Sequence, residues 1–369
     1  MKRILIVFGL MATPAWAQIN PFATSLTKTF YKNLLSNAGK GVYLGHQDAL
    51  AYGLNANGTR WVNEAGRSDI HSVSGQYPAV IGHDLGRLEL DSMNNLDKVP
   101  FHAMKRHILE TFQRGGISTL SWHPNNPTDF SKTSWDKVPF TVQRILRDEE
   151  VKRIYRTWLD KLAAFFADLK TPEGEMIPVI FRPFHEHTGS WFWWGADHCT
   201  PEEYKTLWQE TVRYLVYEKK LNHLLIAYST DYFQSKEHYL ERYPGDQYVD
   251  LLGVDTYHRD APASNASFVS SLRRMLDTLD ELSKEKDKPY AITETGLERV
   301  IETKWWTEVL LPALEGTRTT YVLVWRNGYD KHYYAPYPGH DSAADFLKMI
   351  QTGKVLLSKG VFDQGLYQH

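Results

Sequence analysis

Cysteine is almost absent from this chain of 369 residues, in which Cys199 is the only one. A single cysteine cannot form an internal disulfide. No residues around Cys199 form an arrangement typical of a thiol nucleophile. We therefore expect a buried, unreactive thiol at this position rather than a catalytic one.

An excess of either charge is also missing. The chain carries 42 Lys and Arg against 44 Asp and Glu, a formal net charge of -2, with both signs interspersed. No basic stripe indicates a nucleic-acid partner, and no acidic block indicates disorder. Internal repeats, low-complexity stretches and linkers rich in Pro or Ser are missing as well. This length fits one large barrel as well as two ordinary domains, and the lack of a linker favours one.

The apolar run at the start of the chain, in residues 1–17 (MKRILIVFGLMATPAWA), is too short to span a bilayer. It follows Lys2 and Arg3 and ends in Ala-Trp-Ala before Gln18, which is the pattern of a secretory signal peptide. Because this segment has no cysteine, we expect no lipoprotein-type membrane anchor. The sequence predicts an exported protein with a mature part of 18–369, in the periplasm or, as the alternative, secreted.

Aromatic residues, by contrast, are abundant: they make up 13% of the chain and include 12 Trp and 21 Tyr. The side chains of Trp and Tyr combine a broad apolar face with a polar edge. Such surfaces suit a ligand that has both kinds of surface, as a sugar does.

Short apolar or β-branched runs that end in polar residues recur along the chain. There are eight of them: GVYLGHQ (41–47), AVIGHDLG (79–86), ISTLSWH (117–123), IPVIFRPFHE (177–186), LLIAYSTD (224–231), VDLLGVDTY (249–257), PYAITETG (289–296) and TTYVLVWRN (319–327). Each run has the length and composition of a buried strand.

Segments with helical periodicity separate these runs, most clearly at 151–170, 201–220 and 267–286. Thr200 before Pro201 is typical of an N-cap followed by a first-turn proline. Strands that alternate with helices predict an α/β fold, a single (β/α)8 TIM barrel. An open doubly wound sheet would place a Gly-rich phosphate turn after the first strand, and none is present. The weakly patterned segments 48–78 and 352–369 are expected to wrap the barrel.

Polar residues follow the apolar part of every predicted strand. They are His46, His83, Asp84, Trp122, His123, His185, Glu186, Ser229, Thr230, Asp231, Asp255, Thr256, Tyr257, Glu294, Trp325 and Arg326. The C-terminal ends of parallel barrel strands open on one face, so we expect these side chains to meet in one pocket.

Two glutamates, Glu186 and Glu294, end the fourth and seventh predicted strands. Cleavage of a glycosidic bond requires a carboxyl pair, one protonated to donate to the leaving oxygen and one ionised to meet the anomeric carbon. Aromatic neighbours should desolvate Glu186 and keep its proton available, which predicts the general acid/base. Arg182 and Tyr257 are expected near Glu294 and favour its charged form, which predicts the nucleophile.

The motifs together resemble glycoside hydrolase family 26, a family mainly of β-mannanases, in its bacterial, Bacteroides-type members. The resemblance covers nearly all of 18–369. It rests on GHQ (45–47), GHD (82–84), SWHPNNP (121–127), FRPFHEHTGSWFWWG (181–195), VDTY (254–257), TETG (293–296) and VWRN (324–327). It implies a retaining hydrolase that cleaves β-1,4-mannosidic linkages in mannan, galactomannan or glucomannan. Neither a metal nor another cofactor is implied, and we expect a monomer.

The resemblance assigns roles to the residues that carry the chemistry. Glu186 would be the acid/base and Glu294 the nucleophile. Tyr257 would hydrogen-bond the nucleophile, Asp255 would support it, and Arg182 would orient the site from behind. If the two carboxyl groups stand about 5 to 5.5 Å apart, hydrolysis retains the anomeric configuration.

The resemblance also assigns sugar contacts. His123 and His185 would contact the sugar that is cleaved, and Trp325 would form the platform beneath it. Arg326 would reach the next unit toward the non-reducing end, and Trp191 would stack on the leaving-group side. Without the resemblance, the histidines could equally be core residues and Arg326 a rim ion pair.

Other readings remain open. A β-1,3-xylanase or a mixed-linkage β-glucanase would share this resemblance. After the acid, His187-Thr188 departs from the Met-Asn pair of many relatives, so the resemblance does not define the contacts to the leaving group. A metal-dependent hydrolase or polysaccharide deacetylase is suggested by His185-Glu186-His187 and by His83-Asp84. As alternate residues of a strand, His185 and His187 would share a face and could ligate zinc. A sugar-binding barrel without activity would have lost one glutamate, and both are present. Internal or end-wise cleavage depends on loops that the sequence does not describe.

Overall fold

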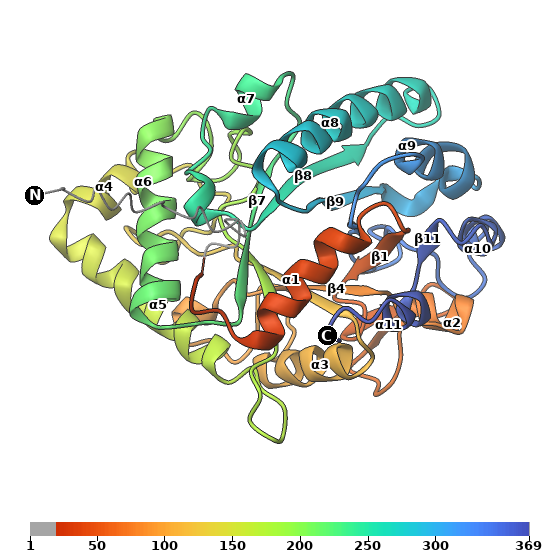
Figure 1. The fold of residues 1–369 in the computed structure, drawn as a ribbon, viewed down its shortest axis with the longest axis horizontal. Helices are drawn as coiled ribbons and strands as arrows, with labels where there is room; N and C mark the ends of the chain where they lie inside the picture. Colours follow the sequence, from red (N-terminus) through yellow and green to blue (C-terminus); the bar gives the residue numbers. More distant parts are fainter. Residues whose placement is uncertain (1–19, 369) are drawn as a thin grey trace, which may run out of the picture.

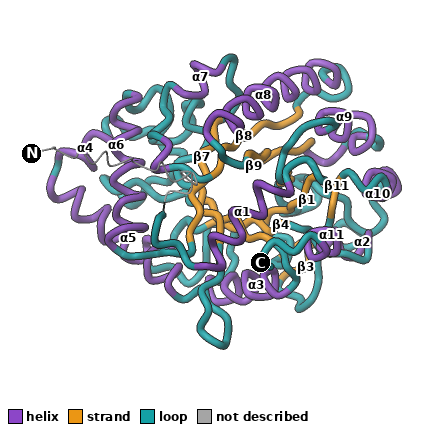
Figure 2. Tube along the Cα trace, in the orientation of Figure 1, coloured by secondary structure: helices purple, strands orange, loops and turns teal. Residues whose placement is uncertain are grey.

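The computed structural model describes residues 20–368, so the predicted signal peptide lies outside the described residues. Eight parallel strands close into a barrel at the centre of the molecule, with helices around it (Figures 1 and 2). In chain order these strands are β1 (Val42–Gln47), β4 (Val80–Asp84), β5 (Ile117–Ser121), β6 (Val179–Arg182), β7 (Leu224–Thr230), β8 (Leu251–His258), β9 (Tyr290–Leu297) and β10 (Tyr321–Val324). Each pairs with the next, and β10 pairs with β1, which confirms the predicted single (β/α)8 barrel.

Helices lie on the outside of this barrel. They are α1 (Ser25–Asn37), α2 (Asp69–Ser74), α3 (Phe101–Gln113), α4 (Thr141–Arg147), α5 (Glu149–Ala167), α6 (Pro201–Val212), α7 (Lys236–Leu240), α8 (Asn265–Lys286), α9 (Leu311–Leu314), α10 (Ala343–Gln351) and α11 (Ser358–Asp363). Short 3-10 turns are η1 (Leu88–Leu90), η3 (Asp246–Tyr248) and η4 (Glu298–Val300), and π-helical segments are η2 (Arg213–Glu218) and η5 (Trp306–Leu310). Among residues 20–368, no helix is long and apolar enough to cross a membrane.

The three clearest helical predictions are confirmed with adjusted ends. The segment 201–220 forms α6 and then η2, where the hydrogen-bond pattern widens to that of a π-helix. Thr200 caps α6 as predicted, because its side chain accepts from the amide of Glu203 while Glu203 reaches back to the amide of Thr200. This reciprocal pair satisfies donors that the first helical turn leaves free.

One hydrophobic cluster joins all eight barrel strands to α1 and the C-terminal segment. It contains Tyr43, Val80, Ile117, Ile180, Leu225, Leu251, Ala291 and Tyr321 from the strands, with Phe30, Tyr31, Leu34, Val361 and Leu366 from outside the barrel. The strand residues named here stand in the first half of each strand. The N-terminal end of the barrel is therefore filled and covered, and only the C-terminal end remains for a ligand.

The segments 48–78 and 352–368 contain more regular structure than their weak patterns suggested. The first contains the antiparallel hairpin of β2 (Tyr52–Leu54) and β3 (Arg60–Val62), and the second contains β11 (Val355–Leu356), which pairs with β1. Buried Asp69 accepts hydrogen bonds from the Leu54 amide, from Trp61 Nε1 and from Asn327 Nδ2. The carboxylate thus joins the hairpin to the loop after β10.

The prediction of a strand over 177–186 is wrong in its length, because β6 ends at Arg182. Pro183 has no amide to continue the ladder, and Phe184 and Glu186 have φ angles of 47° and 53°. These left-handed conformations turn the chain sharply. His185 and Glu186 therefore stand on a turn above the barrel rather than on the strand.

Candidate active site

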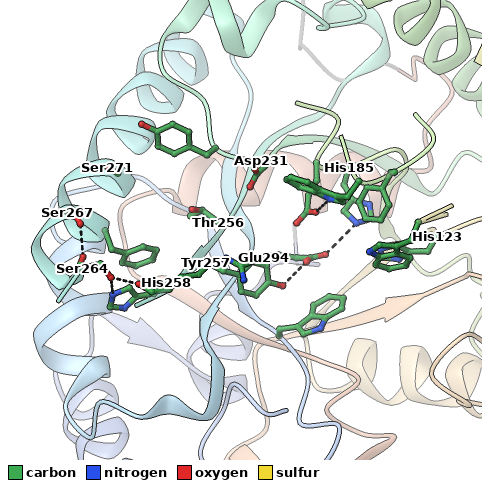
Figure 3. A pocket seen from close by; sticks show the side chains of 18 residues that line it. His123, His185, Asp231, Thr256, Tyr257, His258, Ser264, Ser267, Ser271 and Glu294 are labelled. Carbon is green, nitrogen blue, oxygen red and sulfur yellow. Dashed lines mark hydrogen bonds and ion pairs between the residues drawn. The ribbon is translucent and has the colours of Figure 1, made fainter. Parts of the chain in front are cut away.

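A cavity of about 660 Å³ opens at the C-terminal ends of the strands (Figure 3). Its walls include seven of the predicted site residues, namely His123, His185, Glu186, Trp191, Tyr257, Glu294 and Trp325. Arg182 and Asp255 lie behind this wall, and Arg326 also lies outside the lining. With Asp231 after β7, side chains that follow six of the eight barrel strands therefore meet in this cavity, although they are far apart in sequence. The prediction that all eight strand ends share one pocket is wrong for β1 and β4, because His46 and His83 are buried and do not line it.

Glu294 is held by two donors on β6 and β8. The Arg182 guanidinium donates to Oε1 of Glu294, and the Tyr257 hydroxyl donates to Oε2 at 2.8 Å. The second nitrogen of Arg182 donates to Asp255 Oδ2 at 2.8 Å, and Ser229 donates to the same oxygen at 3.0 Å. Arg182 thus fixes two carboxyl groups at once, which confirms its predicted proximity to Glu294.

The pKa of Asp255 is raised to about 7, mainly by burial and also by the charge of Glu294, against the opposing effect of Arg182. One arginine therefore faces two acidic groups in a region without solvent, since Arg182 is only 2% exposed. A buried charge of this kind is tolerated only when it is paired and hydrogen-bonded.

Glu186 has a different environment from Glu294. Trp191 donates from Nε1 to Glu186 Oε2 at 2.6 Å, and the Glu186 amide donates to the Ser229 carbonyl at 3.1 Å. Burial raises the pKa of Glu186 well above its usual range, and the charges of Glu294, Asp255 and Asp231 add to this effect. The proton on Glu186 is therefore retained at a pH where an ordinary glutamate has lost it.

His123 is oriented by Asp84 at the end of β4. Its Nδ1 lies 2.6 Å from Asp84 Oδ2, and Asp84 also accepts from Ser121 Oγ at 2.6 Å. Burial acts to raise the pKa of Asp84, but His123 and these hydrogen bonds outweigh burial, so the pKa is lowered. The ring of His185 meets His123 edge-on, with centroids 4.5 Å apart.

Sequence reasoning missed Trp135, which lines the cavity from the loop after β5. Its ring stacks on His123 with centroids 4.8 Å apart and is 51% exposed. The only sequence signal was a tryptophan in a polar segment outside the strands and helices, and such a signal does not indicate which cavity the ring borders.

His185 and His187 do not share a strand face, because the backbone turns at Phe184 and at Glu186. His185 contacts the rings of His123 and Phe192, whereas His187 packs against Tyr204 and Tyr228 with centroids 4.4 and 4.7 Å away. Within residues 20–368, no three His, Cys, Asp or Glu side chains are grouped so that they could hold a metal ion. The shared face that the metal-dependent alternative requires is thus not formed.

The four rings of residues 191–194 do not all line the cavity. Trp191 is half-exposed at the cavity, while Trp193 and Trp194 are buried. Trp194 donates to the His185 carbonyl at 2.9 Å and so supports the turn that carries Glu186. Phe192 is buried and also lines the cavity against His185.

Arg326 pairs with Asp97, an acidic residue that the sequence did not single out. Asp48 lies in the same buried group, where Tyr52 donates to its Oδ2 at 2.6 Å. Burial, followed by the charge of Asp97, raises the pKa of Asp48 to about 8. Trp325, by contrast, lines the cavity as predicted. The predicted burial of Cys199 is also confirmed.

A (β/α)8 barrel with one carboxyl group after its fourth strand and another on its seventh, both in one cavity, has the architecture of a glycoside hydrolase. The family model for glycosyl hydrolase family 26 matches residues 19–288, and the chain belongs to this family.

Known proteins of this family are similar over most of the described chain. A family 26 β-mannanase structure from Bacteroides ovatus is 44% identical with a TM-score of 0.88, covering 94% of this chain and 98% of that one. The catalytic domain of an endo-β-1,4-mannanase from Bacillus sp. JAMB-750 is 32% identical with a TM-score of 0.84, covering 95% and 96%. A mannan endo-1,4-β-mannosidase of Bifidobacterium adolescentis is 30% identical over 95% of this chain. The chain spans 38% of the length of that relative.

The raised pKa of Glu186 predicts a pH-dependent gain in stability for Glu186→Gln. A carboxyl group whose pKa is higher in the folded state binds more protons there, so the wild type loses stability as pH rises above the unfolded value of about 4.3. Glutamine keeps an acceptor for Trp191 and carries no charge. Thermal unfolding should show a melting temperature higher by roughly 2 °C or more near pH 7, with the difference shrinking toward pH 4.

Glu173→Gln provides the control, because Glu173 is exposed and lies outside the cavity. Its melting temperature should follow that of the wild type at every pH. A Glu186→Gln protein no more stable than the wild type at pH 7 would contradict the unfavourable burial of the Glu186 charge.

Proposed function

We propose that this protein is a retaining glycoside hydrolase that cleaves β-1,4-mannosidic bonds in mannan, galactomannan or glucomannan. The observation that carries the proposal is the unequal carboxyl pair in one cavity. Glu186 has a pKa raised by burial, while Glu294 accepts hydrogen bonds from Arg182 and Tyr257. Double displacement at an anomeric carbon requires one carboxyl group that keeps its proton for the leaving oxygen and a second that is positioned to attack the carbon.

In the first step, Glu294 attacks the anomeric carbon while Glu186 protonates the departing glycosidic oxygen. This forms a covalent glycosyl-enzyme and releases the leaving sugar. In the second step, Glu186 accepts a proton from water, which attacks the anomeric carbon and frees Glu294. Configuration is retained because the carbon is inverted twice.

The remaining predicted residues would act on the substrate or on these carboxyl groups. Arg182, with Asp255 behind it, and Tyr257 hold Glu294 in place before the reaction, so that little reorganisation is needed at the transition state. His123 and His185 form the wall beside the cleaved sugar, and Trp325 forms a platform. Trp191 orients the carboxyl of Glu186 and borders the leaving group.

Arg326 stands apart from these residues. Its guanidinium is engaged by Asp97, outside the main cavity. We keep its proposed role as a contact toward the non-reducing end, where the ion pair with Asp97 would hold the guanidinium in a single orientation.

The substrate is proposed from the relatives. The protein of Bifidobacterium adolescentis is a mannan endo-1,4-β-mannosidase, and the structure from Bacteroides ovatus is that of a β-mannanase. Hydrolysis should be measured on linear mannan, galactomannan, glucomannan, β-1,3-xylan and mixed-linkage glucan. Activity on the first three with none on the last two is expected, and a preference for xylan or mixed-linkage glucan would overturn the proposal.

The product time course on long mannan distinguishes internal cleavage from release of mannobiose. Mixed oligosaccharide sizes at early times indicate internal cleavage, and one dominant disaccharide indicates cleavage from an end. Proton NMR of the first product should show the β-anomer, because the proposed mechanism retains configuration.

Removal of each carboxyl group should have a different effect. Glu294→Ala should lower turnover by roughly three orders of magnitude or more on every substrate, because no covalent intermediate can form. Glu186→Ala should impair hydrolysis of mannan strongly but spare the first step on a mannobioside with a 2,4-dinitrophenyl group, which leaves without protonation. Equal loss on both substrates would contradict the acid role, and unchanged hydrolysis in Glu294→Ala would contradict the nucleophile.

We further propose that residues 1–17 direct export and are removed, and that the remaining chain acts as a monomer in the periplasm. The support is the sequence pattern of a basic start, a short apolar run and Ala-Trp-Ala. The intact mass of the protein from a periplasmic extract should correspond to a chain that begins at Gln18. Retention of residues 1–17, or recovery from the cytoplasm alone, would refute this.

A further inference from the structure

The cavity extends well beyond the two carboxyl groups. Figure 3 shows His123 and His185 toward one end, Tyr257 and Glu294 between, and Ser264, Ser267 and Ser271 at the other end. A volume of about 660 Å³ is in the range that holds a ligand larger than a single sugar ring. The region near α8 therefore has space that the chemistry at Glu186 and Glu294 does not use.

Tyr232, two residues after the end of β7, lines this region and is 43% exposed. An exposed tyrosine is normally free to move, but Tyr232 is held by Arg274 of α8. Arg274 Nη2 donates to the Tyr232 hydroxyl at 3.0 Å, and its guanidinium carbon lies 5.3 Å from the ring centroid. Arg274 Nη1 also donates to the carbonyls of Phe233 and Gln234, at 3.0 and 2.6 Å. The ring and its loop are thus fixed in place before any ligand binds.

The surroundings of Tyr232 are those of a sugar-binding surface. Ser264, Ser267 and Ser271 line the same cavity, and their spacing of three and four residues places Ser267 and Ser271 on one face of α8. A pyranose ring presents C–H groups on its faces and hydroxyls at its edge. A rigid aromatic ring beside a row of hydroxyls matches both, and the prior ordering of the ring reduces the entropy lost on binding.

The position of Tyr232 relative to Glu186 indicates which part of the substrate it would meet. The Glu186 amide donates to the carbonyl of Ser229, near the end of the strand that leads directly into Tyr232. The proton donor faces the leaving group, so this side of the cavity is the leaving-group side. The Arg326–Asp97 pair joins the loops after β10 and β4, away from β7 and α8.

We propose that Tyr232, held by Arg274, is a stacking platform for the sugar residues on the leaving-group side of the cleaved bond. The ligand is the reducing-end part of a β-1,4-linked hexose chain, bordered by the serine face of α8. This inference rests on the proposed function. Tyr232 contributes to the binding of long substrates, and Arg274 is a positioning residue that acts through the Tyr232 ring.

Two substrates separate this platform from the chemistry. Mannohexaose extends onto the leaving-group side, whereas β-mannobiosyl fluoride has a single atom as its leaving group and cannot reach Tyr232. Tyr232→Ala should lower kcat/KM on mannohexaose by roughly 5- to 10-fold, through loss of one stacked ring. On the fluoride the change should remain within about two-fold.

Tyr232→Phe and Arg274→Met test how the ring is held. Tyr232→Phe keeps the stacking face, so it should retain most of the activity on mannohexaose. In the otherwise wild-type protein, Arg274→Met should reduce activity on mannohexaose. In a protein that already carries Tyr232→Ala, Arg274→Met should cause little further loss of activity, because Arg274 acts through the Tyr232 ring. Additive losses would contradict the positioning role.

Tyr217→Ala is the matched control, since it removes the same atoms from an exposed tyrosine of η2 that lies outside the cavity lining. Its kinetics should equal those of the wild type on both substrates. Equal losses in Tyr232→Ala on the two substrates, or no loss on either, would overturn the platform. If the wild type hydrolyses neither substrate, the proposed function itself fails, which is a separate result.

Discussion

The pairing of one buried arginine with two carboxyl groups is the interaction on which the site depends. Arg182 stands at the end of β6, is 2% exposed and donates to both Glu294 and Asp255. Removing any one of these three buried groups would be unfavourable, because the remaining groups would lose a hydrogen-bonding partner. The barrel must therefore hold β6, β8 and β9 in a register that places Arg182 next to Asp255 and Glu294.

That same register creates the difference between the two carboxyl groups. Glu294 remains on a strand and faces Arg182, whereas Glu186 leaves the strand through a turn with left-handed residues and meets Trp191. Each glutamate has the same intrinsic chemistry. The different roles that we propose for them depend on burial, nearby charge and hydrogen bonding, which differ between the two positions.

Much of this arrangement could be predicted from periodicity and motifs. Apolar runs that end in polar residues predicted the parallel barrel, and the topology of a barrel predicted that Glu186 and Glu294 share a cavity. The extent of β6 was overestimated, because the predicted run was extended to Glu186 while Pro183 and the left-handed Phe184 end the ladder after Arg182. Trp135 and Asp97 were missed because loop residues carry no periodic signal that shows their direction.

The sequence by itself determined the class of fold, the carboxyl pair and the supply of aromatic rings, because these depend on local pattern and on the chain order of strands. The tertiary structure alone decided which side chains contact each other at the open end of the barrel. Trp135 stacks on His123, Asp97 engages Arg326 and Arg274 fixes Tyr232, each across different loops or elements. Such contacts depend on the distances between loops at the open end of the barrel, and these distances are set by packing over the whole domain rather than by neighbours in the chain.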